Sequence, residues 1–127
     1  MELNLDTDEG RYQIRAYGKD FIQVNEQKVM HSLIVTPNQL IDPWPPHSLA
    51  DLNEEHLQII LGLKPNIVLL GSGENLAFPD AALLNVFYQQ KIGIEVMNNG
   101  AVCRTYSVLM SEGRDVAAAL LIGKTTA

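Results

Sequence analysis

The chain has 127 residues, of which 46% are hydrophobic and 19% charged, and it carries a net charge of −6 at pH 7. Its length fits a single domain, residues 1–127, and its composition is that of a folded chain rather than a disordered one. Fifteen acidic against nine basic residues argue against nucleic-acid binding, which needs a clustered basic face, and the single cysteine excludes an internal disulfide.

The apolar runs are too short for a membrane helix. The longest, residues 67–70 and 116–122, fall well short of the ~18 apolar residues that crossing a membrane requires. Residues 1–9 include four acidic side chains, the opposite of a basic signal or transit region. We therefore expect a cytoplasmic protein with no direct membrane insertion.

The first third of the chain has the patterns of β-strands. Residues 11–18 (RYQIRAYG) alternate between apolar and polar side chains, the period of a half-buried strand. Residues 21–25 (FIQVN) follow a turn-like segment as a hairpin partner, and residues 29–37 (VMHSLIVTP) indicate a longer strand ended by Pro37. Such short connections favour antiparallel pairing, so we expect a β-meander.

A proline-rich connector follows at residues 41–48 (IDPWPPHS). Its prolines forbid helix and favour an extended, stiff segment that is too short to separate two domains. Trp44 lies within it, and we expect its ring to pack on the edge of the core because exposing a tryptophan is costly. The alternative is an exposed recognition residue.

The rest of the chain alternates between helix and strand. Asp51 and Glu54 resemble a capping box at the start of a helix that ends at Gly62. Residues 66–70 (NIVLL) have the continuous apolar character of a strand covered on both faces, and a second helix is predicted to begin near Pro79.

The last segments repeat this alternation. Residues 92–97 (IGIEVM) indicate a strand, and residues 99–112 a third helix with Gly113 as its stop. Residues 116–122 (VAAALLI) lack polar side chains and predict a central strand. A β-meander followed by β-α-β-α-β predicts a three-layer α/β fold, a mixed sheet flanked by helices.

The predicted ligand site lies at the carboxyl ends of two parallel strands. Ligands gather there in open α/β sheets because helix N-termini direct their N–H groups outward. If the strands are neighbours, the loops at residues 71–75 and 98–100 line one crevice. Arg104 would then hold an anion, and asparagines and backbone N–H groups would orient it. The candidate ligand-binding residues are Gly71, Ser72, Gly73, Asn98, Asn99, Arg104 and Tyr106.

Complete catalytic or cofactor motifs are missing from the sequence. The Gly-Ser-Gly turn lacks the third glycine of a dinucleotide fingerprint and the Gly-Lys-Ser/Thr ending of a P-loop. His31, His47 and His56 show no metal-ligand spacing. We therefore predict no catalytic residue, no metal and no cofactor, and favour a protein that is not an enzyme.

Cys103 has two interpretations. Near a helix start and beside Arg104, its thiolate would be stabilised, as in a nucleophile. Neighbours in sequence diverge by about 100° around a helix, however, and Cys103 borders an apolar stripe with no histidine placed beside it. We expect a buried, inert thiol.

Two segments resemble a known family. Residues 60–80 (ILGLKPNIVLLGSGENLAFPD) and 93–121 (GIEVMNNGAVCRTYSVLMSEGRDVAAALL) are similar to a conserved family of small domains of unknown function. It includes bacterial and archaeal hypothetical proteins, an adipogenesis-associated mammalian protein and the mitochondrial respiratory complex I assembly factor 3. The chain departs from the family pattern at Asn99, where Thr is common, and at Ser107, where Asn is frequent. The resemblance implies a three-layer α/β fold with a mixed sheet, and no reaction.

These observations leave two hypotheses for function. The first is a non-enzymatic protein-interaction or assembly-type module, as the resemblance implies, with a protein partner bound at an exposed apolar patch of the proline–tryptophan connector or an edge strand. The alternative is a protein or enzyme that binds a small anionic molecule in the predicted crevice. A homodimer formed through an edge of the N-terminal strands is the expected oligomeric state.

Overall fold

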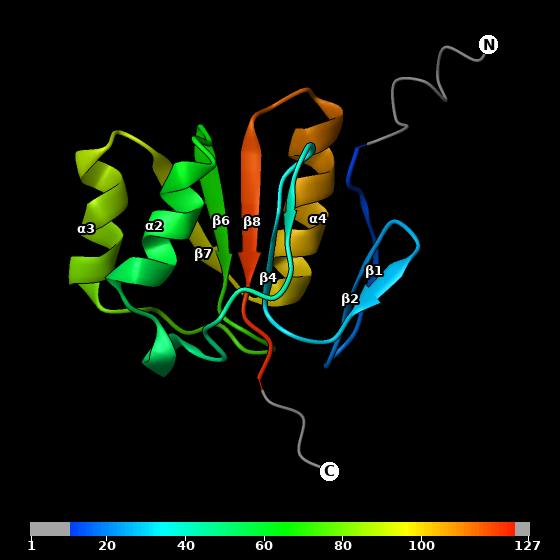
Figure 1. The fold of residues 1–127 in the computed structure, drawn as a ribbon, viewed down its shortest axis with the longest axis horizontal. Coiled ribbons are helices and arrows are strands. Elements are labelled where there is room, and N and C mark those ends of the chain that lie inside the picture. The colour runs from blue at the N-terminus through cyan, green and yellow to red at the C-terminus, as the bar shows by residue number, and fades with distance from the viewer. Residues whose placement is uncertain (1–10, 124–127) are drawn as a thin grey trace.

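The computed structural model describes residues 11–123 and contains two β-sheets (Figure 1). A three-stranded antiparallel meander comprises β1 (Ile14–Tyr17), β2 (Ile22–Val24) and β3 (Gln27–Val29). A five-stranded mixed sheet follows in the chain, with helices on both faces. The predicted fold class, a mixed sheet flanked by helices after an N-terminal meander, is confirmed.

The large sheet has the strand order β5-β4-β8-β6-β7. Strands β6 (Ile67–Gly71), β7 (Gly93–Met97) and β8 (Val116–Leu120) run parallel, whereas β4 (Leu33–Val35) pairs antiparallel with β8 and with β5 (Leu40–Ile41). Every residue of β8 is buried, as its apolar run requires of a strand covered on both faces. The predicted central strand is therefore confirmed.

Two apolar clusters cover the two faces of this sheet. Helices α2 (Glu54–Gly62) and α3 (Ala81–Gln89) pack on one face, and α4 (Asn99–Ser111) packs on the other between the sheet and the meander (Figure 1). Trp44 belongs to the apolar cluster on the face covered by α2 and α3. It is 1% exposed and donates its Nε1–H to the carbonyl of His56 at 3.2 Å. The expectation that Trp44 packs on the core is confirmed, so it offers no exposed patch.

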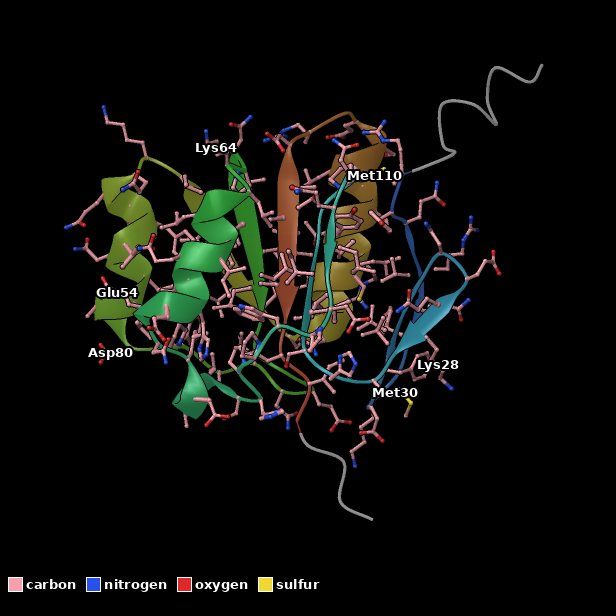
Figure 2. The ribbon with its side chains drawn as sticks, in the orientation of Figure 1. Lys28, Met30, Glu54, Lys64, Asp80 and Met110 are labelled. Atoms are coloured by element: carbon pink, nitrogen blue, oxygen red, sulfur yellow. The ribbon has the colours of Figure 1, made fainter. Side chains whose placement is uncertain are left out.

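The long strand predicted over residues 29–37 was wrong, because the chain changes sheets within it. Strand β3 ends at Val29, Met30 is 50% exposed, and β4 begins at Leu33 in the other sheet (Figure 2). Just before β4, the buried hydroxyl of Ser32 accepts the N–H of Ile122, which follows β8, at 2.8 Å. A contact between residues so far apart in sequence leaves no local signal.

The start of helix α2 also differs from its prediction. Asn53, not Asp51, is the N-cap: its Oδ1 accepts the N–H of His56, and its own N–H donates to His56 Nδ1, both at 3.1 Å. Asp51 instead belongs to a short 3-10 turn, η1 (Leu49–Asp51). Helix α3 likewise begins after Asp80, whose carboxylate accepts the N–H of Ala82 at 3.1 Å.

Helix α4 closely follows its prediction. It spans Asn99–Ser111, and Gly113 follows it with φ of 78°, a conformation that glycine adopts without steric cost. Its N-terminus lies at the carboxyl end of β7, so the fold places the start of this helix at the predicted site.

Candidate functional site

The 71–73 turn and the start of α4 meet at the carboxyl ends of neighbouring strands. Strands β6 and β7 are parallel partners, with Gly71 opposite Met97. The N–H of Ser72 donates to the carbonyl of Met97 at 2.9 Å, which carries the pairing one residue into the turn. The spatial condition for the predicted crevice is thus met.

Asn99 links the 71–73 turn to the start of α4 through its side chain and its backbone. Its Oδ1 accepts the N–H of Gly73 at 3.1 Å, and its Nδ2 donates to the carbonyl of Leu121 at 2.9 Å. Its backbone N–H also donates to the carbonyl of Gly73 at 2.8 Å. The residue is 8% exposed, and a Cβ on Gly71 would collide with its Oδ1. We call this arrangement the Asn99 clasp; it uses both polar ends of the side chain inside the fold.

Ser72 and Asn98 also bond to their own surroundings. The Ser72 hydroxyl lies 2.9 Å from the carbonyl of Asn75 and accepts the N–H of Ala77 at 3.1 Å. Asn98 caps α4 through an Oδ1 bond to the N–H of Ala101 at 2.9 Å. These side chains fix the backbone of the loops.

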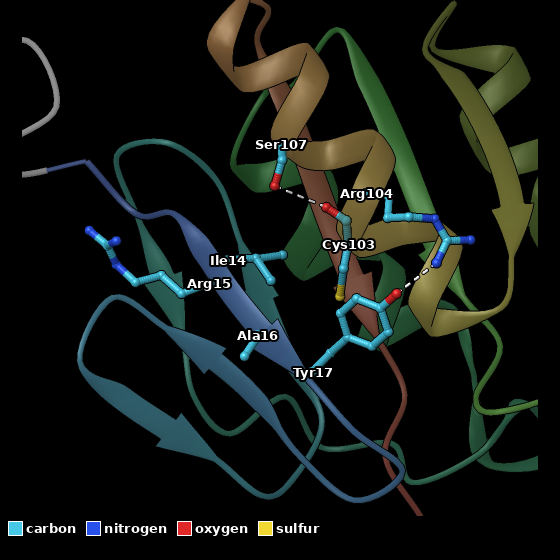
Figure 3. A pocket seen from close by; sticks show the side chains of 7 residues that line it. All are labelled: Ile14, Arg15, Ala16, Tyr17, Cys103, Arg104 and Ser107. Carbon is cyan, nitrogen blue, oxygen red and sulfur yellow. Dashed lines mark hydrogen bonds between the residues drawn. The ribbon is translucent and has the colours of Figure 1, made fainter.

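Arg104 turns toward the meander. Its Nη1 donates to the hydroxyl of Tyr17, at the end of β1, at 2.6 Å (Figure 3). Gly100 makes this approach possible, because a Cβ there would lie 3.1 Å from the Tyr17 ring and 3.3 Å from Arg104 Nη1. We call Tyr17 and Arg104 the tyrosine–arginine pair. The described residues contain one ion pair, His31 with Asp42, so Arg104 has no carboxylate partner among them.

A groove of about 550 Å³ lies between β1 and α4 beside this pair. Figure 3 shows Tyr17 and Arg104 meeting at one end of it, with the Cys103 sulfur on its floor and the Arg15 side chain directed away from α4. A second hollow of about 280 Å³ lies where Tyr17 faces the start of α4 and Glu74. The groove is lined by Ile14, Arg15, Ala16, Tyr17, Cys103, Arg104 and Ser107.

Cys103 and Tyr106 belong to the core. Cys103 is 2% exposed, and burial raises its thiol pKa to about 12 although the charge of Arg104 opposes the shift. The thiol is therefore protonated at neutral pH, and its predicted burial is confirmed. Tyr106 is fully buried, and its hydroxyl donates to the carbonyl of Tyr12 at 2.7 Å. Burial raises the Tyr106 pKa above its usual range, an effect that Arg11 partly offsets.

The structure thus divides the predicted ligand-binding residues. It joins the 71–73 turn to Asn99, uses Asn98 as the cap of α4, places Arg104 with Tyr17, and directs Tyr106 into the core. Sequence reasoning missed Tyr17, which lies 87 positions from Arg104 and has no spacing signal. The ligand-binding role of the set stays a prediction.

A loop at the rim of the site exposes large apolar side chains. In the segment between β6 and α3, residues 72–80, Leu76 is 55% exposed and Phe78 is 67% exposed. The Ser72 hydroxyl, bonded within the same segment, holds its first half in place. We call residues 72–80 the rim loop.

Residues 11–123 lack both a cluster of metal ligands and a helix that could span a membrane. No three His, Cys, Asp or Glu side chains gather in a way that could hold a metal ion. None of the helices described is long and apolar enough to cross a membrane.

Comparison with known proteins places the chain in a family. The family described as "Protein of unknown function (DUF498/DUF598)" matches residues 14–121. The chain belongs to this family. The chain is also similar to the "NADH dehydrogenase [ubiquinone] 1 alpha subcomplex assembly factor 3" of Xenopus tropicalis, with 31% identity over 110 residues. The match covers 85% of this chain and 60% of that protein, so the chain spans about three fifths of its relative.

Two other proteins match over nearly their whole length. The "13 kDa major membrane protein" of Francisella tularensis subsp. holarctica is 24% identical over 118 residues, covering 89% of this chain and 96% of that protein. An NMR structure of a Xanthomonas campestris protein is 39% identical, with a TM-score of 0.85, and covers 100% of this chain and 96% of that one. The fold of this chain is therefore shared with the Xanthomonas structure over its described region.

Proposed function

We propose that the chain is a non-enzymatic, assembly-type protein-interaction module whose rim loop contacts a protein partner. The observation that carries the proposal is the exposure of Leu76 and Phe78, at 55% and 67%. Large apolar side chains on the surface are typical anchors of protein interfaces. Because the Ser72 hydroxyl already holds the first half of the loop in place, binding requires less ordering there, which lowers its entropic cost.

The names of several relatives support the same class of function. The Xenopus relative is named as an assembly factor for a subcomplex of NADH dehydrogenase. Since this chain spans 60% of that protein, we propose the general role, binding a protein during assembly, without its particular partner. A cytoplasmic location, a single domain over residues 1–127, and a homodimer through the N-terminal strands complete the proposal. Cell fractionation and gel filtration test the first and last of these.

The direct experiment compares two exposed aromatic residues. Phe78→Ser removes the rim-loop anchor, whereas Tyr88→Ser changes a residue on α3 that is 57% exposed. Neither substitution should alter stability by more than about 0.5 kcal/mol, because both side chains are mostly in solvent. We expect one partner to co-purify in stoichiometric amount with the wild type and with Tyr88→Ser.

Recovery of that partner with Phe78→Ser should fall about tenfold or more, the effect expected of an interface anchor. Equal recovery with both variants, or no stoichiometric partner for the wild type, contradicts the proposal.

A second candidate function, binding of a small anion, is favoured by the tyrosine–arginine pair. Arg104 has no carboxylate partner among residues 11–123, and Tyr17 places its hydroxyl beside the guanidinium. Two donors at the mouth of the 550 Å³ groove suit a carboxylate or phosphate group. This position differs from the predicted crevice, since Arg104 bonds to β1 and not to the 71–73 turn.

Calorimetric titration with inorganic phosphate and with acetate tests this candidate. Arg104→Gln should abolish any heat of binding, and Arg114→Gln should leave it unchanged because Arg114 is exposed and does not line the groove. Equal losses in both variants would indicate a general effect of charge and reject a specific site.

A further inference from the structure

Strand β7 is an edge of the large sheet with unsatisfied backbone groups. The N–H of Gly93 donates to the carbonyl of Asn66 at 3.2 Å, and the carbonyl of Met97 accepts from Ser72 at 2.9 Å. Bonding alternates along a parallel strand, so Gly93, Glu95 and Met97 bond toward β6. Ile94 and Val96 therefore direct their N–H and C=O groups outward, away from the sheet.

These outward groups have no hydrogen-bond partner among residues 11–123. No residue of β7 is fully buried, whereas all of β8 is. The other edge of the sheet, β5, is only two residues long, but β7 has five. An open strand of that length is a template for pairing with another extended chain.

The side chains of β7 give this edge a chemical character. Ile94 and Val96 are half-buried and pack against the apolar cluster beneath α2 and α3. Glu95, between them, points to the opposite face and is exposed. It has no ion-pair partner, since His31 with Asp42 is the one pair in the described region. The edge therefore presents a single free negative charge between two apolar positions.

We propose that β7 binds an extended segment of a protein partner as an added antiparallel strand, with Lys or Arg opposite Glu95 and apolar residues on either side of it. This inference rests on the proposed protein-binding function and names its mode. The outward groups of Ile94 and Val96 would form the hydrogen-bonded pairs of the new ladder. Glu95 would then occupy a non-hydrogen-bonded pair, where Cα atoms are about 4.5 Å apart and opposing side chains lie closest.

Charge argues against two other occupants of this edge. In a second copy of the chain, the two-fold register that uses both Ile94 and Val96 places Glu95 opposite Glu95, and like charges directly opposed are destabilising. The chain's own residues 1–10 contain four acidic and no basic residues, so they also bring negative charge. A basic segment of another protein removes this repulsion.

An NMR titration of the isotope-labelled chain tests the inference. The probe is a blocked peptide, Thr-Val-Lys-Val-Thr, and the matched control has Glu in place of Lys. We expect the lysine peptide to shift the amide signals of Ile94 and Val96 and to slow their solvent exchange. It should bind roughly threefold to tenfold more tightly than the glutamate peptide, the range for exchanging a repulsive cross-strand pair for an attractive one.

Reversing one charge in the protein distinguishes the effect of cross-strand pairing on peptide binding from the effect of net charge. Glu95→Lys should reverse the peptide preference. Glu112→Lys makes the same charge change on an exposed residue after α4 and should leave the preference unchanged.

Three outcomes would overturn the inference: no shift at Ile94 and Val96, equal binding of both peptides, or pairing of β7 with a second copy as concentration rises. If the peptide fails while partner recovery still depends on Phe78, only the edge assignment is lost. If peptide binding succeeds but partner recovery does not depend on Phe78, the proposed role of the rim loop is lost instead.

Discussion

Two of the polar contacts between helix α4 and the rest of the molecule are of opposite kinds. At its start, the Asn99 clasp is 8% exposed, and every polar atom of the side chain is bonded inside the fold. One turn later, the tyrosine–arginine pair lies at the surface, with Tyr17 41% exposed. The first contact holds the site together, and the second leaves donors that solvent or a ligand can reach. Polarity at a helix start is therefore insufficient evidence for a binding site.

The two contacts also differ in the free energy lost when a hydrogen bond is removed. A buried backbone group that loses its partner costs about 1–3 kcal/mol, because water cannot replace the bond. At the surface water does replace it, so the loss is small. Substitutions in the clasp should therefore lower stability, whereas substitutions in the pair should change binding alone.

The largest effect is expected for Asn99→Leu. It leaves the N–H of Gly73 and the carbonyl of Leu121 without a side-chain partner, which should lower the free energy of unfolding by about 2–4 kcal/mol. Urea denaturation measures the loss. The control is Asn98→Ala, which removes only a helix cap and should cost about 1 kcal/mol. Equal losses would contradict the special role of the clasp.

Gly71→Ala should disturb the same Asn99 clasp from the end of strand β6. The added Cβ would collide with Asn99 Oδ1 and lie 3.1 Å from the Leu120 side chain, so we expect a loss of about 1–3 kcal/mol. Gly62→Ala, with no atom within 4 Å of its added Cβ, should be neutral or stabilising by up to about 1 kcal/mol. A stable Gly71→Ala variant would show that Asn99 can move without penalty.

Tyr106→Phe should have an intermediate effect, because it breaks the bond that ties α4 to the chain before β1. Loss of the bond to the carbonyl of Tyr12 should cost about 1 kcal/mol. Hydrogen exchange should rise in β1 more than in β8. Uniform exchange changes across both strands would mean that the bond does not anchor the meander.

The buried thiol of Cys103 should make the free energy of unfolding fall at alkaline pH. Because the folded thiol has a pKa of about 12 against an ordinary value of 9.0, the unfolded chain releases its proton first. Folding is thus favoured below the ordinary value and weakens as pH rises between the two. From pH 8 to pH 10 the wild type should lose about 1 kcal/mol more than Cys103→Ala, measured by urea unfolding. Parallel losses would place the thiol in contact with water.

The smallest effect on stability is expected for Tyr17→Phe. It removes an exposed hydroxyl, so the free energy of unfolding should change by less than about 0.5 kcal/mol. If the groove binds phosphate or acetate, affinity should nevertheless fall, because Arg104 loses the group that positions it. A large loss of stability would mean that the tyrosine–arginine pair, like the Asn99 clasp, stabilises the fold.

Local patterns were sufficient to predict the layers of the fold. The apolar run in β8, the Gly-Ser-Gly turn after β6 and the glycine after α4 each act within a few residues. Long-range bonds were not predictable. The hydroxyl of Ser32 accepts the N–H of Ile122, 90 positions away, and the hydroxyl of Tyr17 accepts from Arg104 across 87 positions.

The location of the candidate site was predictable from the sequence, but which of its polar atoms are free to bind a ligand was not. Parallel neighbours brought the 71–73 turn to the start of α4, as the alternation of strands and helices required. Which polar atoms remain free depends on hydrogen bonds that form only after packing, and here Asn99 bonds to Gly73 and Leu121. The same packing exposes Phe78, which no sequence period marks.

The central claim, that the rim loop holds a protein partner, is tested most directly by a photo-reactive phenylalanine analogue placed at Phe78 or at Tyr88 in living cells. Both positions are more than half exposed, at 67% and 57%. The account predicts one adduct of defined mass from position 78 and none from position 88. The same adducts from both positions, or no adduct from position 78, would contradict it.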